Sequence, residues 1–154
     1  MNVFAETSFL CAVHRQQDNS PAALAYLADC TAPIDVTTLV LYEFRQGVHF
    51  QNWLHRHDKK KGYAAQEAAA MLERLEENLS HGIFRVVPVD WTAVHDLAGR
   101  LAAEHTPAAG ARGFDLLHIA TAVEGKAETF LSFDRPQRQV AIAAGLPVAP
   151  QRER

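Results

Sequence analysis

The chain has 154 residues, of which 48% are apolar, and this size and composition predict one folded domain with a single hydrophobic core. Charged residues make up 21% and the formal net charge is −3, which excludes a globally basic nucleic-acid binder and a disordered polyelectrolyte. Contact with a nucleic acid would therefore depend on local basic patches or on bound metal ions. The predicted domain spans residues 1–150, followed by a short polar tail at 151–154.

The first half of the chain alternates short apolar runs with helical periodicity. Residues 2–5 form a predicted strand, and Thr7 and Ser8, which are helix-capping types, open the helix behind it. Ser20-Pro21 begins a second helix. Residues 34–37 are a second strand, followed by a long helix from residue 38 to about residue 57. After a charged break at 56–62, apolar residues recur at helical spacing from 68 to 79, and His81-Gly82 ends this helix.

The second half continues the same alternation. Residues 83–89 are the clearest predicted strand, and Asp90 caps the next helix. A Pro/Gly/Ala-rich loop is predicted at 106–113, and a helix follows that opens at Asp115. A strand at 129–133, a helix at 136–144 and an edge strand at 146–149 complete the pattern. Strands separated by helices favour an α/β fold: a three-layer α/β/α sandwich with a central parallel sheet.

Cysteine usage and hydropathy bear on the location of the protein. Cys11 and Cys30 lie in apolar helical contexts without CxxC or metal-ligand spacing, so we expect reduced, buried thiols. No stretch approaches 18 consecutive apolar residues, so we expect no membrane span. The apolar N-terminus has no basic leader and is interrupted by Glu6, which argues against a signal peptide. A cytoplasmic protein is the expectation.

Four acidic residues stand in apolar sequence, where a lone carboxylate is usually avoided. Glu6 follows the first strand, Glu43 lies about two turns into the long helix, Asp115 is in the first turn of its helix, and Asp134 ends the fourth strand. Ligands collect beyond the carboxyl ends of parallel strands, so these side chains are expected to converge. Two carboxylates ~4 Å apart repel by roughly 4 kcal/mol at an effective dielectric near 20, so convergence requires protonation or a divalent cation. A hard cation with oxygen ligands, Mg²⁺ or Mn²⁺, is the natural counter-charge.

These residues resemble the acidic motifs of a known family. Phe-Ala-Glu-Thr-Ser-Phe-Leu at 4–10, Glu43, Asp-Leu-Leu-His-Ile-Ala-Thr-Ala at 115–122 and Phe-Leu-Ser-Phe-Asp at 130–134 look like those of the PIN domain, in the same order. The chain is most similar to the VapC-type ribonuclease toxins of bacterial toxin–antitoxin pairs. The resemblance runs from Val3 to about Val148.

The resemblance implies a Rossmann-like sheet and an endoribonuclease that depends on Mg²⁺ or Mn²⁺. Carried over by position, Glu6, Glu43, Asp115 and Asp134 are the catalytic and metal-binding acids. Ser8 and Ser132 match hydroxyl residues that hold those carboxylates in place. The resemblance also implies a small protein antitoxin as partner and a homodimer, with the helical segments 20–58 and 63–79 as candidate interfaces.

One position departs from the family pattern, because the first acid is ordinarily aspartate and is Glu6 here. The extra methylene keeps the charge but moves the oxygens, which octahedral Mg²⁺ tolerates poorly. A second hypothesis is therefore a catalytically weak or silent PIN-like module that binds RNA or a protein. A third, a different α/β phosphoryl-transfer enzyme or hydrolase, lacks the GxGxxG, GxxxxGK[ST] and GxSxG signatures.

Basic residues flank the last two acidic motifs. Arg112, Arg135 and Arg138 could bind RNA phosphates or balance the acidic cluster, and the sequence leaves both interpretations open. His118 lies one turn after Asp115. A structural histidine, hydrogen-bonded beside the sheet, is the favoured interpretation over a catalytic one.

Overall fold

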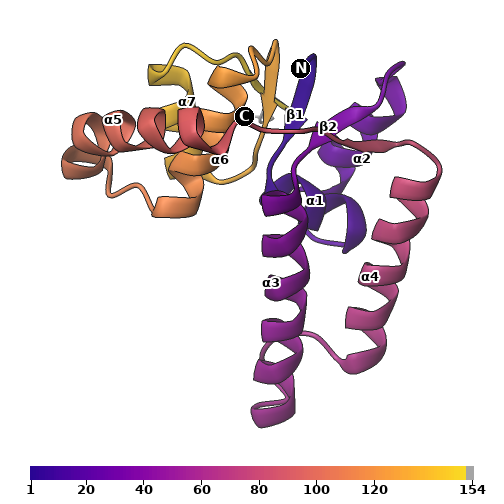
Figure 1. Cartoon of the computed structure of the whole chain (residues 1–154). Helices are drawn as coiled ribbons and strands as arrows, with labels where there is room; N and C mark the ends of the chain where they lie inside the picture. Colours follow the sequence, from indigo (N-terminus) through magenta and orange to yellow (C-terminus); the bar gives the residue numbers. More distant parts are fainter. Residues whose placement is uncertain (152–154) are drawn as a thin grey trace.

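The computed structural model describes residues 1–151, so the predicted tail lies outside the described residues apart from Gln151 (Figure 1). A five-stranded parallel sheet runs through the part of the chain that is described, in the order β3-β2-β1-β4-β5. The strands are β1 (Val3–Ala5), β2 (Ile34–Val36), β3 (Phe84–Val86), β4 (Thr129–Leu131) and β5 (Val148–Ala149). The predicted α/β sandwich with a parallel sheet is confirmed.

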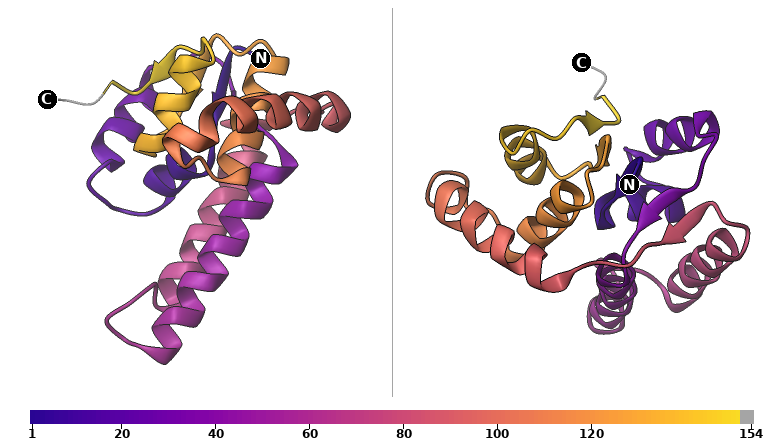
Figure 2. Two further views of the ribbon diagram at one scale, coloured as in Figure 1. Left: turned by 90° about the vertical axis from the view of Figure 1, so that its left-hand side faces the viewer. Right: turned by 45° about the horizontal axis from the view of Figure 1, so that its top comes forward.

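The helices divide into two groups. The first comprises α1 (Thr7–His14), α2 (Ser20–Asp29), α3 (Thr38–His57) and α4 (Ala65–Ser80). The second comprises α5 (Trp91–Ala109), α6 (Gly113–Glu124) and α7 (Arg135–Ala143). Figure 2 shows these two groups on either side of the strands. Crossovers between parallel strands are right-handed in nearly all proteins. The chain leaves β1 toward β2 and β3 and then returns past β1 to β4 and β5, so this rule places the two groups of helices on opposite faces.

This reversal places a topological switch point between β1 and β4. The two strands pair in register from Val3 opposite Thr129 to Ala5 opposite Leu131. Loops that leave adjacent strands toward opposite faces open a crevice at the carboxyl edge of a parallel sheet. Glu6 directly follows β1, and Asp134 lies three residues beyond β4. The fold therefore brings these two acids, far apart in sequence, to the same crevice.

The core lies between the sheet and the helices. Phe4 on β1 and Phe130 on the adjacent strand β4 stack with ring centroids 6.1 Å apart, and both are fully buried. Phe9 from α1 stacks on Phe133 beyond β4 at 6.0 Å. These contacts join the first and last thirds of the chain immediately below the crevice.

All five strands are shorter than the sequence predicts, and β3 and β4 show why. Val87 still donates a backbone hydrogen bond to Val36, but Pro88 follows, which has no backbone N–H to donate. Beyond β4, the backbone N–H of Phe133 donates to the Ser8 hydroxyl instead of to a neighbouring strand. The ladders end where the backbone turns toward the site.

Several local predictions are wrong. Glu6, rather than Thr7 or Ser8, caps α1. The loop predicted at 106–113 is helical as far as Ala109, with Pro107 inside the last turn. Proline costs one hydrogen bond there, and Gly110 then ends the helix in the left-handed conformation. Cys11 and Cys30 are free thiols, but both are partly exposed rather than buried. Cys11 lies in a cavity wall, and Cys30 is the C-terminal residue that flanks α2.

The α3–α4 hairpin projects away from the sheet (Figures 1 and 2). Its connecting loop folds back onto α3, where Tyr63 N–H donates to Gln51 O at 3.1 Å and Asn52 Nδ2 donates to Tyr63 O at 3.1 Å. Gly62 has φ +65°, and a Cβ there would lie 1.9 Å from Gln51 O, so only glycine fits. None of the helices within residues 1–151 is both long enough and apolar enough to cross a lipid bilayer.

Candidate active site

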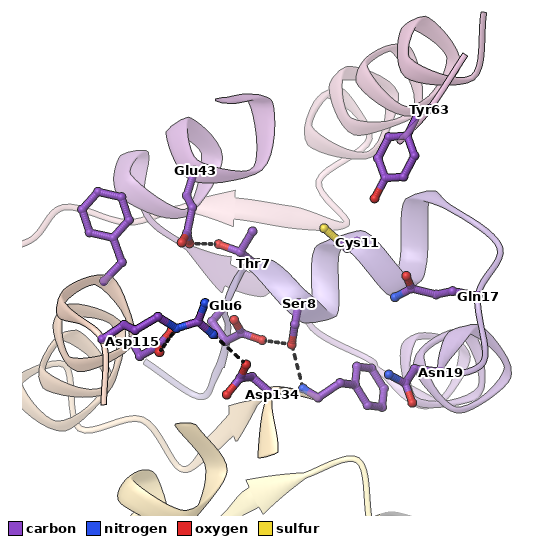
Figure 3. A pocket seen from close by; sticks show the side chains of 13 residues that line it. Glu6, Thr7, Ser8, Cys11, Gln17, Asn19, Glu43, Tyr63, Asp115 and Asp134 are labelled. Carbon is purple, nitrogen blue, oxygen red and sulfur yellow. Dashed lines mark hydrogen bonds and ion pairs between the residues drawn. The ribbon is translucent and has the colours of Figure 1, made fainter. Parts of the chain in front are cut away.

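A cavity of about 630 Å³ opens at the carboxyl edge of the sheet, and all four acids singled out in the sequence line it (Figure 3). Each comes from a different helix or helix start. The residues that line the cavity are Glu6, Thr7, Ser8, Cys11, Gln17, Asn19, Glu43, Tyr63, Arg112, Phe114, Asp115, Phe133 and Asp134. The structure therefore brings together the four acids that the sequence analysis placed at this edge.

Glu6 is the most enclosed of the four acids, with only 4% of its surface exposed. Its Oε1 accepts hydrogen bonds from the Ser8 hydroxyl and from Phe9 N–H at 3.3 Å, so the carboxylate turns back onto its own helix as an N-cap. Burial raises the pKa of Glu6, although hydrogen bonds from Ser8 and Ser132 oppose this. Its carboxylate thus already has a structural task.

The two serines connect the loops around the site. Ser8 donates to Glu6 and accepts a hydrogen bond from Phe133 N–H at 2.7 Å, which ties α1 to the segment after β4. Ser132 is fully buried; its hydroxyl donates to Gln137 Oε1 at 2.8 Å and accepts from Asp134 N–H at 3.1 Å. Both hydroxyls therefore fix the backbone from which Glu6 and Asp134 project.

Glu43 is held by two donors that converge on one oxygen. Thr7 Oγ1 donates to Glu43 Oε2, and His118 Nε2 lies 2.7 Å from the same atom. Burial alone would raise the pKa of Glu43, but the hydrogen bonds from His118 and Thr7, together with the charge of Arg112, outweigh it and lower that pKa. Glu43 is therefore ionised at neutral pH, and no hydrogen bond within the described part of the chain uses its Oε1.

Asp115 and Asp134 share one counter-ion. The Arg112 guanidinium lies 3.3 Å from Asp115 Oδ2 through Nε and 3.3 Å from Asp134 Oδ2 through Nη2. Burial raises the pKa of Asp115; Arg112 opposes this rise, while the charges of Asp134 and Glu43 add to it. Three carboxylates are thus close enough to interact, with a single guanidinium between two of them.

Helix N-termini also favour negative charge in this crevice. Asp134 caps α7 by accepting from Gln137 N–H at 2.9 Å, and Asp115 lies in the first turn of α6. The partial positive charge of a helix N-terminus stabilises a nearby carboxylate by typically 0.3–1 kcal/mol. The fold therefore places partial positive charge beside these two carboxylates.

The three arginines considered above have different surroundings. Arg112 lines the cavity and pairs with two of the acids, whereas Arg135 and Arg138 do not line it. Arg138 Nη1 donates to the backbone carbonyls of Ser132 and Ala149, which clamps β4 to β5. A role in binding RNA phosphates stays a prediction for all three.

Thr7 is a site residue that the sequence analysis missed, because it was interpreted only as a helix-capping type. A hydroxyl directly after the first acid was the available signal. His118 is 1% exposed and hydrogen-bonded beside the sheet, as expected. Its partner, however, is one of the candidate acids. No pattern in one sequence shows that α6 and α3 would place His118 against Glu43.

The donor set has the chemistry of a site for a hard cation, since carboxylate oxygens are the ligands that Mg²⁺ and Mn²⁺ prefer. As the side chains lie, though, no three His, Cys, Asp or Glu residues within 1–151 are grouped so that they could hold a metal ion. Glu6 is engaged as a helix cap, and Arg112 occupies the Oδ2 atoms of both aspartates. The carboxylates are therefore suitable ligands for Mg²⁺ or Mn²⁺, but in this structure Asp115 and Asp134 are paired with Arg112, and Glu6 caps α1.

The family model of the PIN domain matches residues 3–143. This chain is a PIN domain. The match spans all four acids, so the family suggested by the acidic motifs is confirmed. A comparison with curated protein sequences gave no significant match.

Several solved structures share this fold. FitAcB from Neisseria gonorrhoeae has 18% identity and a TM-score of 0.66, with 95% of each chain covered. VapC20 from Mycobacterium tuberculosis, described as a toxin that cleaves the sarcin-ricin loop, has 20% identity and a TM-score of 0.63, covering 94% of this chain and 96% of that one. VapBC2 from Rickettsia felis, bound to a DNA fragment from its promoter, has 16% identity and a TM-score of 0.64, covering 97% and 98%.

Proposed function

We propose that this PIN domain is an endoribonuclease that depends on a divalent cation, Mg²⁺ or Mn²⁺, and hydrolyses RNA phosphodiester bonds. The observation that supports this most strongly is the joint placement of Glu6, Glu43, Asp115 and Asp134 around one cavity at the topological switch point. The similarity to a toxin that cleaves the sarcin-ricin loop supports RNA as the substrate.

The acids differ in what they can do. Asp115, Asp134 and Glu43 are the residues that would hold the cation, because their carboxylates face the cavity and interact with one another. A bound divalent cation supplies positive charge to the scissile phosphate and acidifies water. The structure supports a positioning role for Glu6, which holds the start of α1 and, through Ser8, the segment after β4.

The proposed reaction also requires the Glu43 carboxylate to be held in a fixed orientation. Thr7 and His118 bind the same oxygen of Glu43, so Oε1 is the atom available to orient a water molecule or to bind a cation. A low pKa keeps this carboxylate charged at neutral pH. Arg112 stands at the mouth of the cavity, where its charge can also meet a phosphate of the substrate.

Cleavage of total RNA tests the proposal. The wild-type protein should cut RNA with Mg²⁺ or Mn²⁺ and stop when EDTA is added. Asp115→Asn keeps the size of the side chain but removes a charge, so cleavage should fall at least a hundredfold while the fold is retained. Cleavage that persists in EDTA, or in Asp115→Asn, would contradict the proposed site.

A second candidate function is the silent RNA-binding or interaction module. It is favoured by one observation: the carboxylate of Glu6 is buried and used as a helix cap. RNA binding with no cleavage at any Mg²⁺ or Mn²⁺ concentration would support this alternative and exclude the nuclease.

We also propose that the protein is the toxin of a toxin–antitoxin pair, works in the cytoplasm, binds a small protein antitoxin and forms a homodimer. Similarity to structures of the FitAB and VapBC complexes supports the antitoxin partner. An exposed aromatic ridge on α3 supports coverage by a protein: Tyr42, Phe50 and Trp53 each expose about half of their surface, and the last two rings stack at 5.7 Å.

Light scattering tests the homodimer directly. Trp53→Ser should convert a dimer into a monomer if a second copy covers the ridge on α3. A wild-type monomer, or a dimer that Trp53→Ser leaves intact, would exclude α3 as the dimer contact. A short neighbouring gene for a DNA-binding antitoxin would support the toxin role.

A further inference from the structure

The position of Arg112 carries an inference that rests on the proposed cation site but concerns this chain's own residues. Arg112 is the residue that flanks the N-terminus of α6, and its side chain reaches over Asp115 in the same turn and across to Asp134 at the start of α7. These are the two acids that project from the helices on one face of the sheet. The guanidinium therefore spans the space between two of the candidate ligands.

We propose that Arg112 is an internal competitor of the divalent cation: its ion pairs with Asp115 and Asp134 and a cation bound by those two carboxylates exclude each other. The argument begins with the atoms involved. The same oxygen type, Oδ2, is used on each aspartate, and each lies 3.3 Å from a guanidinium nitrogen. Asp134 Oδ1 already accepts from Gln137 N–H, so a cation held by both carboxylates would have to share Asp134 Oδ2 with Arg112.

Charge is the second step. A divalent cation between the aspartates would lie within a few ångströms of the guanidinium, and like charges at that distance repel strongly in a half-buried site. Arg112 therefore has to leave before the cation enters. Its departure costs little, because 75% of its side chain is exposed and the ion pairs of a solvent-exposed side chain are weak. Competition of this kind should weaken cation binding a few-fold to tenfold, without preventing it.

Arg112 also reduces the repulsion between the acids when no cation is bound. Asp115 interacts unfavourably with Asp134 and Glu43, and Arg112 offsets that repulsion. In the absence of a cation, the arginine keeps the charges of the cavity balanced, so the site stays formed. When the arginine is displaced, it remains tethered at the mouth of the cavity, where an RNA phosphate can accept its hydrogen bonds.

Direct measurement of Mn²⁺ binding by electron paramagnetic resonance, without RNA, tests this inference. Arg112→Ala should bind Mn²⁺ three to ten times more tightly than the wild type. Arg112→Lys should lie between the two, because a single ammonium cannot bridge both carboxylates as a guanidinium does. As a second readout, Mn²⁺ should raise the melting temperature of Arg112→Ala more than that of the wild type.

Arg135→Ala is the matched control. Arg135 follows Asp134 directly and carries the same charge, but it forms no ion pair with an acid within residues 1–151. Its removal should change the Mn²⁺ affinity less than twofold. Equal tightening in Arg112→Ala and Arg135→Ala would reduce the effect to general electrostatics and overturn the inference.

Other outcomes separate the inference from the proposed function. In one outcome, the wild type binds Mn²⁺ measurably and loses this binding in Asp115→Asn, while Arg112→Ala binds Mn²⁺ no more tightly than the wild type. This result overturns the competition but leaves the cation site in place. Absence of Mn²⁺ binding in the wild type and in every variant overturns both.

Discussion

Replacement of His118 by leucine should separate the activity of this protein from its stability. His118 is fully buried, and its two ring nitrogens have opposite situations. Nε2 lies 2.7 Å from Glu43 Oε2, whereas Nδ1 has no hydrogen-bond partner in the described structure. Leucine removes both the hydrogen bond from Nε2 to Glu43 and the buried Nδ1 that has no partner. These two changes have opposite effects on the free energy of unfolding.

The magnitudes nearly cancel. A hydrogen bond to a charged group contributes about 1.5–3 kcal/mol. The lower value applies here, because 29% of the Glu43 side chain is exposed and water can replace the lost donor. A buried polar atom without a partner costs about 1–3 kcal/mol, which the substitution recovers. The free energy of unfolding should therefore change by less than about 1 kcal/mol.

Activity should respond differently. Without His118, Thr7 is the one hydrogen-bond donor left to the Glu43 carboxylate among residues 1–151, so the carboxylate can rotate away from the cavity. Loss of a residue that orients a cation ligand typically costs about ten- to a hundredfold in metal affinity or activity. RNA cleavage by His118→Leu should fall by this factor, and the loss should be partly recovered at higher Mn²⁺ concentration, since the remaining ligands are intact.

The chain offers a matched control in a second buried histidine. His14 is also 1% exposed, but both of its nitrogens have partners: Nδ1 lies 2.7 Å from Leu10 O, and Nε2 lies 3.0 Å from Asn78 Nδ2. His14→Leu removes two satisfied contacts and no orphan, so it should cost about 2–3 kcal/mol of stability and leave the cleavage rate of the folded protein unchanged.

Urea denaturation followed by tryptophan fluorescence gives the two stabilities, and cleavage of a fluorescent RNA gives the two rates. If His118→Leu loses more than about 2 kcal/mol and cleaves RNA at the wild-type rate, then the orphaned nitrogen and the positioning of Glu43 have both been misjudged.

Three further predictions follow from particular contacts. Glu6→Asp keeps a capping carboxylate but restores the length usual in the family, so RNA cleavage should be several-fold faster; an equal or slower rate would show that glutamate does not limit the site. Arg85→Ala should lower the free energy of unfolding by about 2–3 kcal/mol in urea denaturation, because it leaves the fully buried Asp35 without the guanidinium that lies 2.7 Å away. Adding Asp35→Asn to this variant should recover part of the loss. Burial lowers the pKa of His14 below its ordinary value of 6.5, so, as the pH falls, the unfolded chain takes up a proton before the folded chain does. The free energy of unfolding should therefore be full above pH 6.5 and fall as the pH drops from 6.5 toward the folded pKa. A melting temperature that is flat between pH 6.5 and 5 would contradict this.

The order and type of the elements were predictable because local patterns specify them. The long helix at 38–57 matches its prediction at both ends, since Thr37 caps its start by accepting from Val40 N–H. The helix through Pro107 was not predictable in the same way. One missing hydrogen bond near a helix end is a small cost, which the packing of α5 against α6 can outweigh.

The site, too, was predictable in its residues but not in their contacts. Which residues are acidic, and which of them follow strands, can be read from the chain, and parallel topology then requires Glu6 and Asp134 to meet at one edge. The contacts of each acid could not be read in this way. Whether Glu6 faces the cavity or caps its own helix depends on rotamers and neighbours.

By itself, then, the sequence determined the alternation of strands and helices, the PIN family and the identity of the four acids, because these depend on residue type and spacing. Only the tertiary structure decided that Thr7 and His118 bind Glu43 and that Arg112 stands between Asp115 and Asp134. Except for the local pair Arg112–Asp115, these contacts join elements that are distant along the chain, and they depend on ångström-scale distances that no one-dimensional pattern records.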